Sequence, residues 1–288
     1  MRFSNKRKGG LFVAATLAAF HGLLMSAGPL RGEEHPGHRP RESGDGIVIT
    51  IVYDNYPFDE RLETAWGFAC VIEGLSETIL FDTGGSGELL LSNMAKLHFQ
   101  PKDIHSIVLS HIHGDHTGGL ATFLSANGDV KVFFPRAFPS DIKREIRRLT
   151  STVVETDGPC QVCENASTTG VTGVGIQEQG LWIETSDGAV VITGCAHPGI
   201  VPMTTAVKER VNMPMSTVMG GFHMSGAPAQ RIMEVIADLK KLGIQNVGPC
   251  HCSGEQTRQL MREHFGDGYL PTGVGARLVF SSKALEDR

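Results

Sequence analysis

The sequence LSHIHGDHTGG occupies residues 109–119, near the middle of the chain. Within six of these residues lie three imidazoles and one carboxylate, contributed by His111, His113, Asp115 and His116. The apolar residues that lead into the motif are typical of a buried strand, and the glycine pair that ends it allows a sharp turn. Histidine nitrogen and carboxylate oxygen both coordinate zinc and iron. The segment therefore predicts a metal-binding loop at a strand end, rather than a histidine-rich surface loop.

This run resembles the His-x-His-x-Asp-His motif of the metallo-β-lactamase superfamily. Four further segments are similar to one branch of it, the metallohydrolases that resemble 7,8-dihydropterin-6-yl-methyl-4-(β-D-ribofuranosyl)aminobenzene 5'-phosphate synthase. They read FDTG at 81–84, TGCAHPG at 193–199, GGFH at 220–223 and PCHCSG at 249–254. The likeness runs from about Ile47 to the C-terminus. It implies an α/β protein with the αββα sandwich of that superfamily and the activity of a metal-dependent hydrolase.

The hydrophobic pattern of the rest of the chain predicts strands that alternate with amphipathic helices in two halves. Strands are expected at residues 47–53, 68–72, 78–81, 107–109, 130–134, 181–185, 189–193, 217–220 and 276–281. Helices are expected to open at Ser86, Leu120, Ser140, Pro228 and Glu255. Such alternation indicates two sheets faced by helices.

The length of 288 residues suits a single large α/β domain behind an N-terminal targeting segment. Positive charges at the start precede an apolar stretch over residues 11–25, and Ser26-Ala27-Gly28 offers small residues for cleavage. We expect a signal peptide at 1–28, a disordered linker at 29–46 and the hydrolase domain at 47–288. The protein would then be periplasmic or secreted and free of the membrane after cleavage. An uncleaved N-terminal membrane anchor is the alternative, because residues 11–30 are nearly long enough to span a bilayer.

Three polar motifs each follow a predicted strand, so neighbouring strands would bring them together at one edge of the sandwich. The expected metal ligands are then two sets of three, namely His111, His113 and His197, and Asp115, His116 and His251. Two metal ions about 3.5–4 Å apart can share a water and lower its pKa. A metal-bound hydroxide would then attack a small ester, lactone, phosphodiester or amide-type substrate. The net charge of -5 gives no basis for a nucleic-acid partner.

Four further positions are expected to support this chemistry. The resemblance implies catalytic roles for Asp115 and for His223, the latter as substrate anchor, proton donor or additional ligand. Thr-Gly-Cys at 193–195 stands where relatives often have Thr-Gly-Asp with a bridging Asp, so Cys195 is a candidate replacement ligand. Asp82, at a strand end, is expected to accept the ring N–H of a ligand histidine. Asp54 and Asn55 are weaker candidates for substrate contact.

Several alternatives stay open at the level of sequence. One or two zinc ions are expected, with iron or manganese as other choices, and the same residues suit an iron-dependent redox enzyme or a non-enzymatic metal-binding or sensing protein. Export permits disulfides. Cys160 and Cys163 can form one, hold a metal or act as a redox pair, and Cys250 or Cys252 can bridge to that loop, while two reduced cysteines without any bridge are an equal alternative.

Overall fold

The computed structural model of the chain describes residues 46–150 and 152–283. The expected signal peptide at 1–28 and nearly all of the expected linker lie outside the described residues. Among the described helices, none combines the length and apolar character that a membrane crossing requires.

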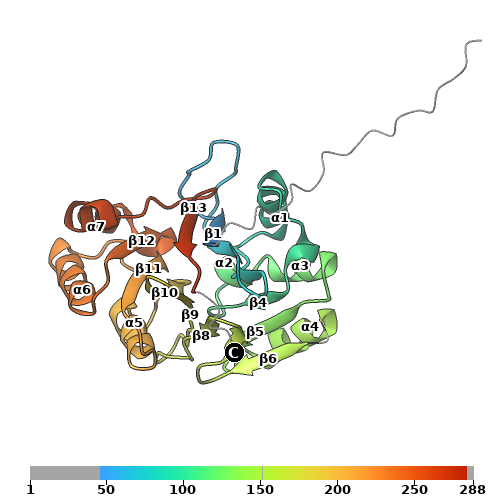
Figure 1. Cartoon of the computed structure of the whole chain (residues 1–288). Helices are drawn as coiled ribbons and strands as arrows, with labels where there is room; N and C mark the ends of the chain where they lie inside the picture. The colour runs from blue at the N-terminus through green and yellow to red at the C-terminus, as the bar shows by residue number, and fades with distance from the viewer. Residues whose placement is uncertain (1–45, 151, 284–288) are drawn as a thin grey trace, which may run out of the picture. The chain divides into compact units, whose positions relative to one another are not determined.

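Two β-sheets form the centre of the described domain (Figure 1). The first has the strand order β13-β1-β2-β3-β4-β5-β6. Its strands are β1 (Gly46–Tyr53), β2 (Ala69–Glu73), β3 (Ile79–Phe81), β4 (Ser106–Val108), β5 (Lys131–Pro135), β6 (Val153–Thr156) and β13 (Arg277–Ser281). The second has the order β12-β11-β10-β9-β8-β7. Its strands are β7 (Gln161–Cys163), β8 (Ala166–Thr168), β9 (Leu181–Thr185), β10 (Gly188–Thr193), β11 (Met215–Gly221) and β12 (Asn246–Cys250).

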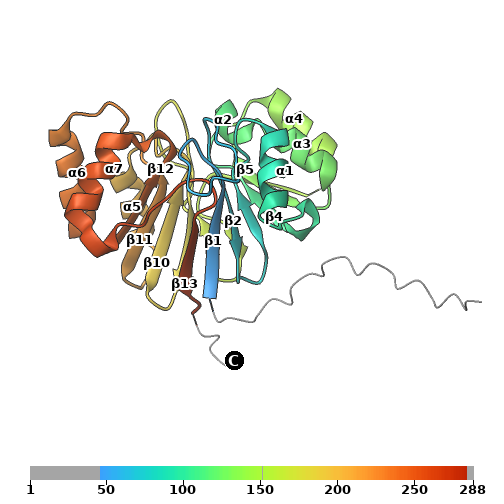
Figure 2. The same cartoon turned by 90° about the horizontal axis from the view of Figure 1, so that it is seen from above.

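Helices cover the outer face of each sheet, which confirms the αββα sandwich (Figure 2). The first sheet carries α1 (Gly87–Lys96), α3 (Leu120–Ala126) and α4 (Ser140–Leu149), with the one-turn helix α2 (Gly114–Thr117) at its edge. The second sheet carries α5 (Ile200–Lys208), α6 (Ala229–Lys241) and α7 (Glu255–Phe265). Short 3₁₀ turns lie at η1 (Pro101–Asp103), η2 (His251–Ser253) and η3 (Gly266–Gly268).

Three apolar clusters pack the two sheets and the two helical layers together. Between the sheets, Ile49 and Phe68 of the first sheet share a buried cluster with Ile192 of the second. The other two clusters lie under the helices, one around Phe123 and the other around Leu239. Because both faces of each sheet are covered, the central strands are apolar throughout rather than alternating.

Most elements lie within a residue or two of their expected positions, and the exceptions have a local cause. The strands β6, β7, β8 and β12 and the helix α5 had no predicted range. Strands of three or four residues are too short to show a period, so β6 to β8 left no pattern to detect. Pro228, expected in the first turn of its helix, instead occupies the N-cap position with φ -65° and ψ 148°.

Strand direction fixes where the polar motifs lie. β3 to β6 run parallel to one another in the first sheet, and β10 to β12 run parallel to one another in the second. Parallel strands end at the same edge of a sheet. Asp82 follows β3 at that edge, the 109–119 motif follows β4, and three further loops follow β10, β11 and β12.

Candidate metal centre

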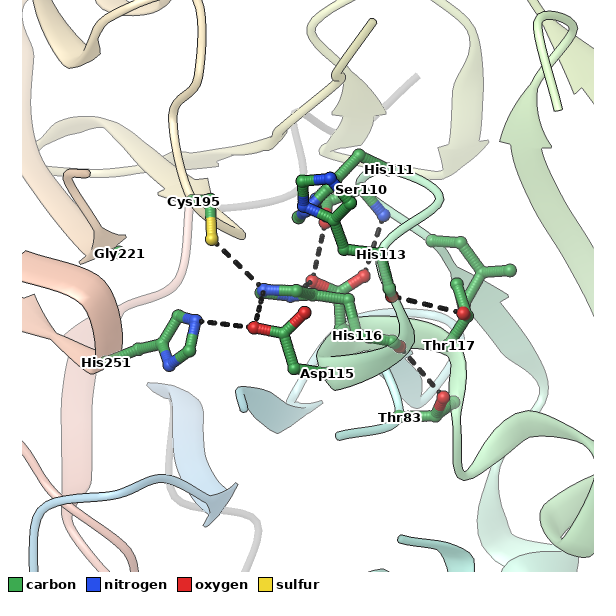
Figure 3. A network of polar contacts seen from close by, with 12 residues as sticks. Thr83, Ser110, His111, His113, Asp115, His116, Thr117, Cys195, Gly221 and His251 are labelled. Atoms are coloured by element: carbon green, nitrogen blue, oxygen red, sulfur yellow. Dashed lines mark hydrogen bonds and ion pairs between the residues drawn. The ribbon is translucent and has the colours of Figure 1, made fainter. Parts of the chain in front are cut away.

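The side chains expected to bind metal lie together at the carboxyl ends of these parallel strands. Figure 3 shows all of them except His197. The donor atoms form three sets, and within each set all of them lie within 4.8 Å of one another. The sets are Asp115, His116, Cys195 and His251; His111, Cys195 and His197; and Cys195, His223 and Cys252. Cys195 belongs to every set. Its sulfur therefore lies close to donors of both ligand groups.

The three-histidine group is closely packed. His111 Nε2 lies 3.1 Å from His113 Nδ1, and the ring of His197 lies 4.6 Å from that of His111 and 4.8 Å from that of His113. Burial, with the positive potential of His116 next, lowers the pKa of His111 to about 2. The imidazole is therefore neutral, which is the form that coordinates a metal.

The second group faces the first across the ring of His116. His116 Nε2 lies 3.2 Å from Cys195 Sγ and 3.7 Å from Asp115 Oδ2, and the same carboxylate oxygen lies 3.3 Å from His251 Nε2 (Figure 3). The rings of His116 and His251 are 5.0 Å apart. A nitrogen, an oxygen and a sulfur donor thus converge on one small volume with a further nitrogen beside it.

Asp82 and Ser110 orient the rings of His111 and His116 through hydrogen bonds to their Nδ1 atoms. Asp82 Oδ2 lies 2.7 Å from His116 Nδ1 and accepts the Ser110 hydroxyl at 2.7 Å, while its Oδ1 accepts the Ser110 N–H. The Ser110 hydroxyl also lies 2.9 Å from His111 Nδ1. The ring of His116 therefore turns Nε2 toward Cys195, because Nδ1 is held by a buried carboxylate.

Glu178 supports the loop after β10, and sequence reasoning missed it. Its carboxylate accepts the backbone N–H groups of Cys195, Ala196 and His197 at 2.8–2.9 Å and lies 2.8 Å from His197 Nδ1. Burial by itself would raise the pKa of Glu178, but these hydrogen bonds outweigh it and hold the pKa at about 2. The only signal in the sequence is one acidic residue in a segment rich in glycine and threonine, which is too weak to single it out.

Asp54 and Asn55 both contact His251, and a substrate contact for them stays a prediction. Asp54 is fully buried, and its Oδ1 accepts the N–H of His251 at 3.2 Å. Asn55 Oδ1 lies 2.9 Å from His251 Nδ1. Burial raises the pKa of Asp54 to about 6. On the other side, the exposed ring of Trp66 lies 4.7 Å from that of His251.

Backbone strain gathers at the same place. Six non-glycine residues of the described chain have positive φ, and four of them lie in these loops: Asp82 at 56°, Ala196 at 57°, His223 at 51° and His251 at 46°. Such conformations cost free energy and persist where the surrounding contacts over-determine them. All four residues follow the ends of parallel strands, where the backbone turns at the edge of the sheet.

The third donor group lies at the open side of the site. His223 is exposed, whereas Cys195 and Cys252 are buried. Hydrogen bonding from Cys195, and then from His223, lowers the pKa of the Cys252 thiol despite its burial. The same contact with Cys252 raises the pKa of His223. The sequence identified His223 but gave Cys252 no role beyond a disulfide.

All six cysteines are free thiols in the structure. Neither the 160–163 disulfide nor a bridge from residues 250–252 to that loop is present. Cys160 and Cys163 instead pack against the cluster between the sheets. The hydroxyl of Thr117 donates to the backbone carbonyl of His113 at 3.1 Å.

Comparison with known proteins extends this description. The family model of the metallo-beta-lactamase superfamily matches residues 67–223. A 7,8-dihydropterin-6-methyl-4-(beta-D-ribofuranosyl)-aminobenzene-5'-phosphate synthase of Methanocaldococcus jannaschii is 28% identical over 285 residues, which cover 81% of this chain and 96% of the relative. The crystal structure of Tm1679, a metal-dependent hydrolase of the beta-lactamase superfamily, matches with a TM-score of 0.68 and 25% identity over 81% of this chain and 98% of that one. Human tRNase Z, short form, matches with a TM-score of 0.54 and 14% identity over 80% of this chain and 98% of that one, a likeness of fold alone.

Proposed function

Because the chain belongs to the metallo-β-lactamase superfamily, as its motifs predicted, we propose that it is a metal-dependent hydrolase of a small ester, lactone or phosphodiester, with zinc as its ion. The observation that carries the proposal is the convergence of His111, His113 and His197 beside Asp115, His116 and His251. The solved hydrolase Tm1679, with the same fold at 25% identity, supports the reaction class.

The donor set fits a metal ion. His251 Nε2 is buried and has no hydrogen-bond partner, although it faces Asp115. A buried polar atom without a partner is costly, and a coordinated ion would satisfy it. Imidazole, carboxylate and thiolate together suit zinc, while imidazole and carboxylate also suit iron or manganese.

The residues of the chain would divide the work of hydrolysis. A bound zinc ion supplies Lewis-acid activation of water and stabilises charge on the substrate oxygen. Asp115, which is partly exposed, can accept a hydrogen bond from the attacking water and hold it in line. His223, exposed beside His197 with ring centroids 4.5 Å apart, can donate a proton to the leaving group when its ring is not coordinated to a metal ion.

The surroundings of the site favour a substrate that carries negative charge. A pocket beside His197 and His223 is also lined by Arg231, whose guanidinium can pair with a phosphate or carboxylate. The relative from Methanocaldococcus jannaschii is named for a 5'-phosphate compound, which supports placing phosphate esters first among the substrates tested. The exposed ring of Trp66 offers a stacking surface on the other side of His251.

The test is a panel of activated esters, lactones and phosphodiesters, assayed with the zinc-loaded full chain. We expect metal-dependent turnover of at least one class, and we expect His113→Ala to reduce kcat/KM by at least about 100-fold. His264→Ala, an exposed histidine on α7, is the matched control and should leave turnover unchanged. Full metal loading without metal-dependent hydrolysis of any class would overturn the proposal, and iron with visible colour in untreated protein would favour the redox alternative.

We also propose export of the protein, on the basis of the sequence of residues 1–28 alone. Intact-mass measurement of the protein from its native membrane and soluble fractions tests this. A mature N-terminus near residues 28–33 supports cleavage, whereas retained Met1 contradicts it.

A further inference from the structure

Two buried cysteines and one histidine meet at the open edge of the metal centre, and they come from three different strand ends. Cys195 follows β10, His223 follows β11 and Cys252 lies in the turn after β12. Their donor atoms lie within 4.8 Å of one another. Cys252 is not part of either three-residue ligand group proposed above.

The backbone is built around these sulfurs. Cys252 Sγ accepts the N–H of His223 at 3.3 Å and lies 3.6 Å from the carbonyl oxygen of Cys195. A Cβ added at Gly221 would lie 2.8 Å from Cys252 Sγ and 3.2 Å from Cys195 Cα. Only a residue without a side chain leaves Cys252 Sγ and the Cys195 backbone in place, so the close approach of these two cysteines depends on glycine here.

We propose that Cys195, Cys252 and His223 form a thiolate-rich subsite for a borderline or soft metal ion such as Zn²⁺ or Cd²⁺. In tetrahedral coordination such donors lie about 3.5–3.8 Å apart, so the observed spacing needs only a small contraction. Two buried sulfurs at this separation become stable as thiolates when a cation neutralises them. His223, being exposed, leaves a path for the ion to enter.

The subsite extends the proposed metal centre and does not depend on hydrolysis. Because Cys195 also lies 3.2 Å from His116 Nε2, an ion bound by the subsite would share its sulfur with the ligands around His116. Thiolate donors select soft and borderline ions over manganese and magnesium. The subsite therefore predicts a metal preference that a set of nitrogen and oxygen ligands would not have.

The experiment is metal binding by the full chain under reducing conditions, with Co²⁺, Cd²⁺ and Mn²⁺ as probes. We expect a sulfur-to-cobalt charge-transfer band in the wild type that loses roughly half its intensity in Cys252→Ser, since one of two thiolates is removed. The same variant should lower Cd²⁺ affinity by about 10-fold or more and leave Mn²⁺ affinity unchanged. Cys160→Ser, a partly exposed cysteine that packs against the cluster between the sheets, is the matched control and should alter neither.

A band that Cys252→Ser does not change would overturn the subsite, because Cys195 would then be the sole sulfur ligand. X-ray absorption of the zinc-loaded wild type needs no variant and should show sulfur at about 2.3 Å; nitrogen and oxygen alone would also overturn it. If the band depends on Cys252 but no substrate is hydrolysed, the subsite stands and the proposed hydrolase fails. If the histidines bind cobalt without sulfur and hydrolysis occurs, the proposed hydrolase stands and the subsite fails.

Discussion

The carboxylate of Glu178 lies 2.8 Å from His197 Nδ1 and also accepts the backbone N–H of that residue. It thus fixes both the ring orientation and the loop that carries the ring. A neutral amide can accept from some of these donors but presents its own N–H to others. We expect Glu178→Gln to weaken zinc binding by about 10–100-fold, measured by competition with a chromophoric chelator. Glu184→Gln, in β9, is the control; equal affinity of Glu178→Gln and wild type would contradict the role assigned to Glu178.

Removal of the metal should destabilise the fold. The site holds a buried His251 nitrogen without a hydrogen-bond partner and several metal-donor atoms at short range. An ion that binds only the folded chain stabilises the fold by mass action. With zinc at about 100 times its Kd, we expect about 2.7 kcal/mol of stabilisation, or a rise in Tm of about 5–10 °C for a domain of this size. Thermal unfolding with and without a chelator measures this. An unchanged Tm would argue against a bound ion.

Asp82→Asn should weaken the hydrogen bond that orients the ring of His116 without disturbing the backbone. Asparagine tolerates the positive φ of 56° that Asp82 adopts, so strain is not introduced. The amide cannot accept from Ser110 and His116 as the carboxylate does, and one buried donor is left without an acceptor. We expect a loss of about 1–3 kcal/mol in the free energy of unfolding, measured by urea titration. Asp267→Asn in η3 serves as control, and equal stability of Asp82→Asn and wild type would contradict this role.

Gly221→Ala should be disruptive for steric reasons alone. The added Cβ would lie 2.3 Å from the carbonyl oxygen of Gly194 as well as close to Cys252 Sγ. Since that oxygen belongs to backbone, the strands must shift, at a cost of about 1–3 kcal/mol. Gly158→Ala is the matched control, because a Cβ there meets nothing within 4 Å. Urea unfolding midpoints of the two variants measure this cost. Equal midpoints would contradict the close approach of Gly221 to the carbonyl oxygen of Gly194.

The ion pairs that join α4 to β6 should give a small acid-dependent stability. Hydrogen bonding from Lys143, whose Nζ lies 2.9 Å from Glu155 Oε2, lowers the pKa of Glu155, and Arg147 adds to it. A lowered folded-state pKa stabilises the fold above the unfolded value, and this contribution is lost as the pH falls through the folded value. The Glu155→Gln variant should therefore be less stable than wild type at pH 7 by at most about 1 kcal/mol. The difference should vanish toward pH 3.

Urea unfolding of both proteins across that range, in chelator, measures the effect. Glu164→Gln, an exposed glutamate in the turn between β7 and β8, is the control. A difference that grows as the pH falls would contradict the assigned sign.

Much of the fold could be predicted because the signals are local. Helices α4, α6 and α7 show an apolar face at helical spacing, and the central strands are apolar runs bounded by glycine or charge. The segments that escaped prediction are those with no period to detect, such as β7 and β8, whose place is set by pairing with β9. Glu178 also escaped, because nothing in the sequence near it indicates that it contacts the loop of His197.

The sequence alone determined that His111, His113, Asp115 and His116 lie close together, because six consecutive residues at a strand end cannot place their side chains far apart. Tertiary structure alone decided what meets them. Cys195 and Cys252 are 57 residues apart in sequence, yet their sulfurs lie within 4.8 Å of one another. They meet because β10, β11 and β12 are parallel neighbours in a register that pairs Thr193 with Gly220 and Gly221 with Cys250. That register depends on hydrogen bonding and side-chain packing across the whole sheet, which no single stretch of the chain encodes.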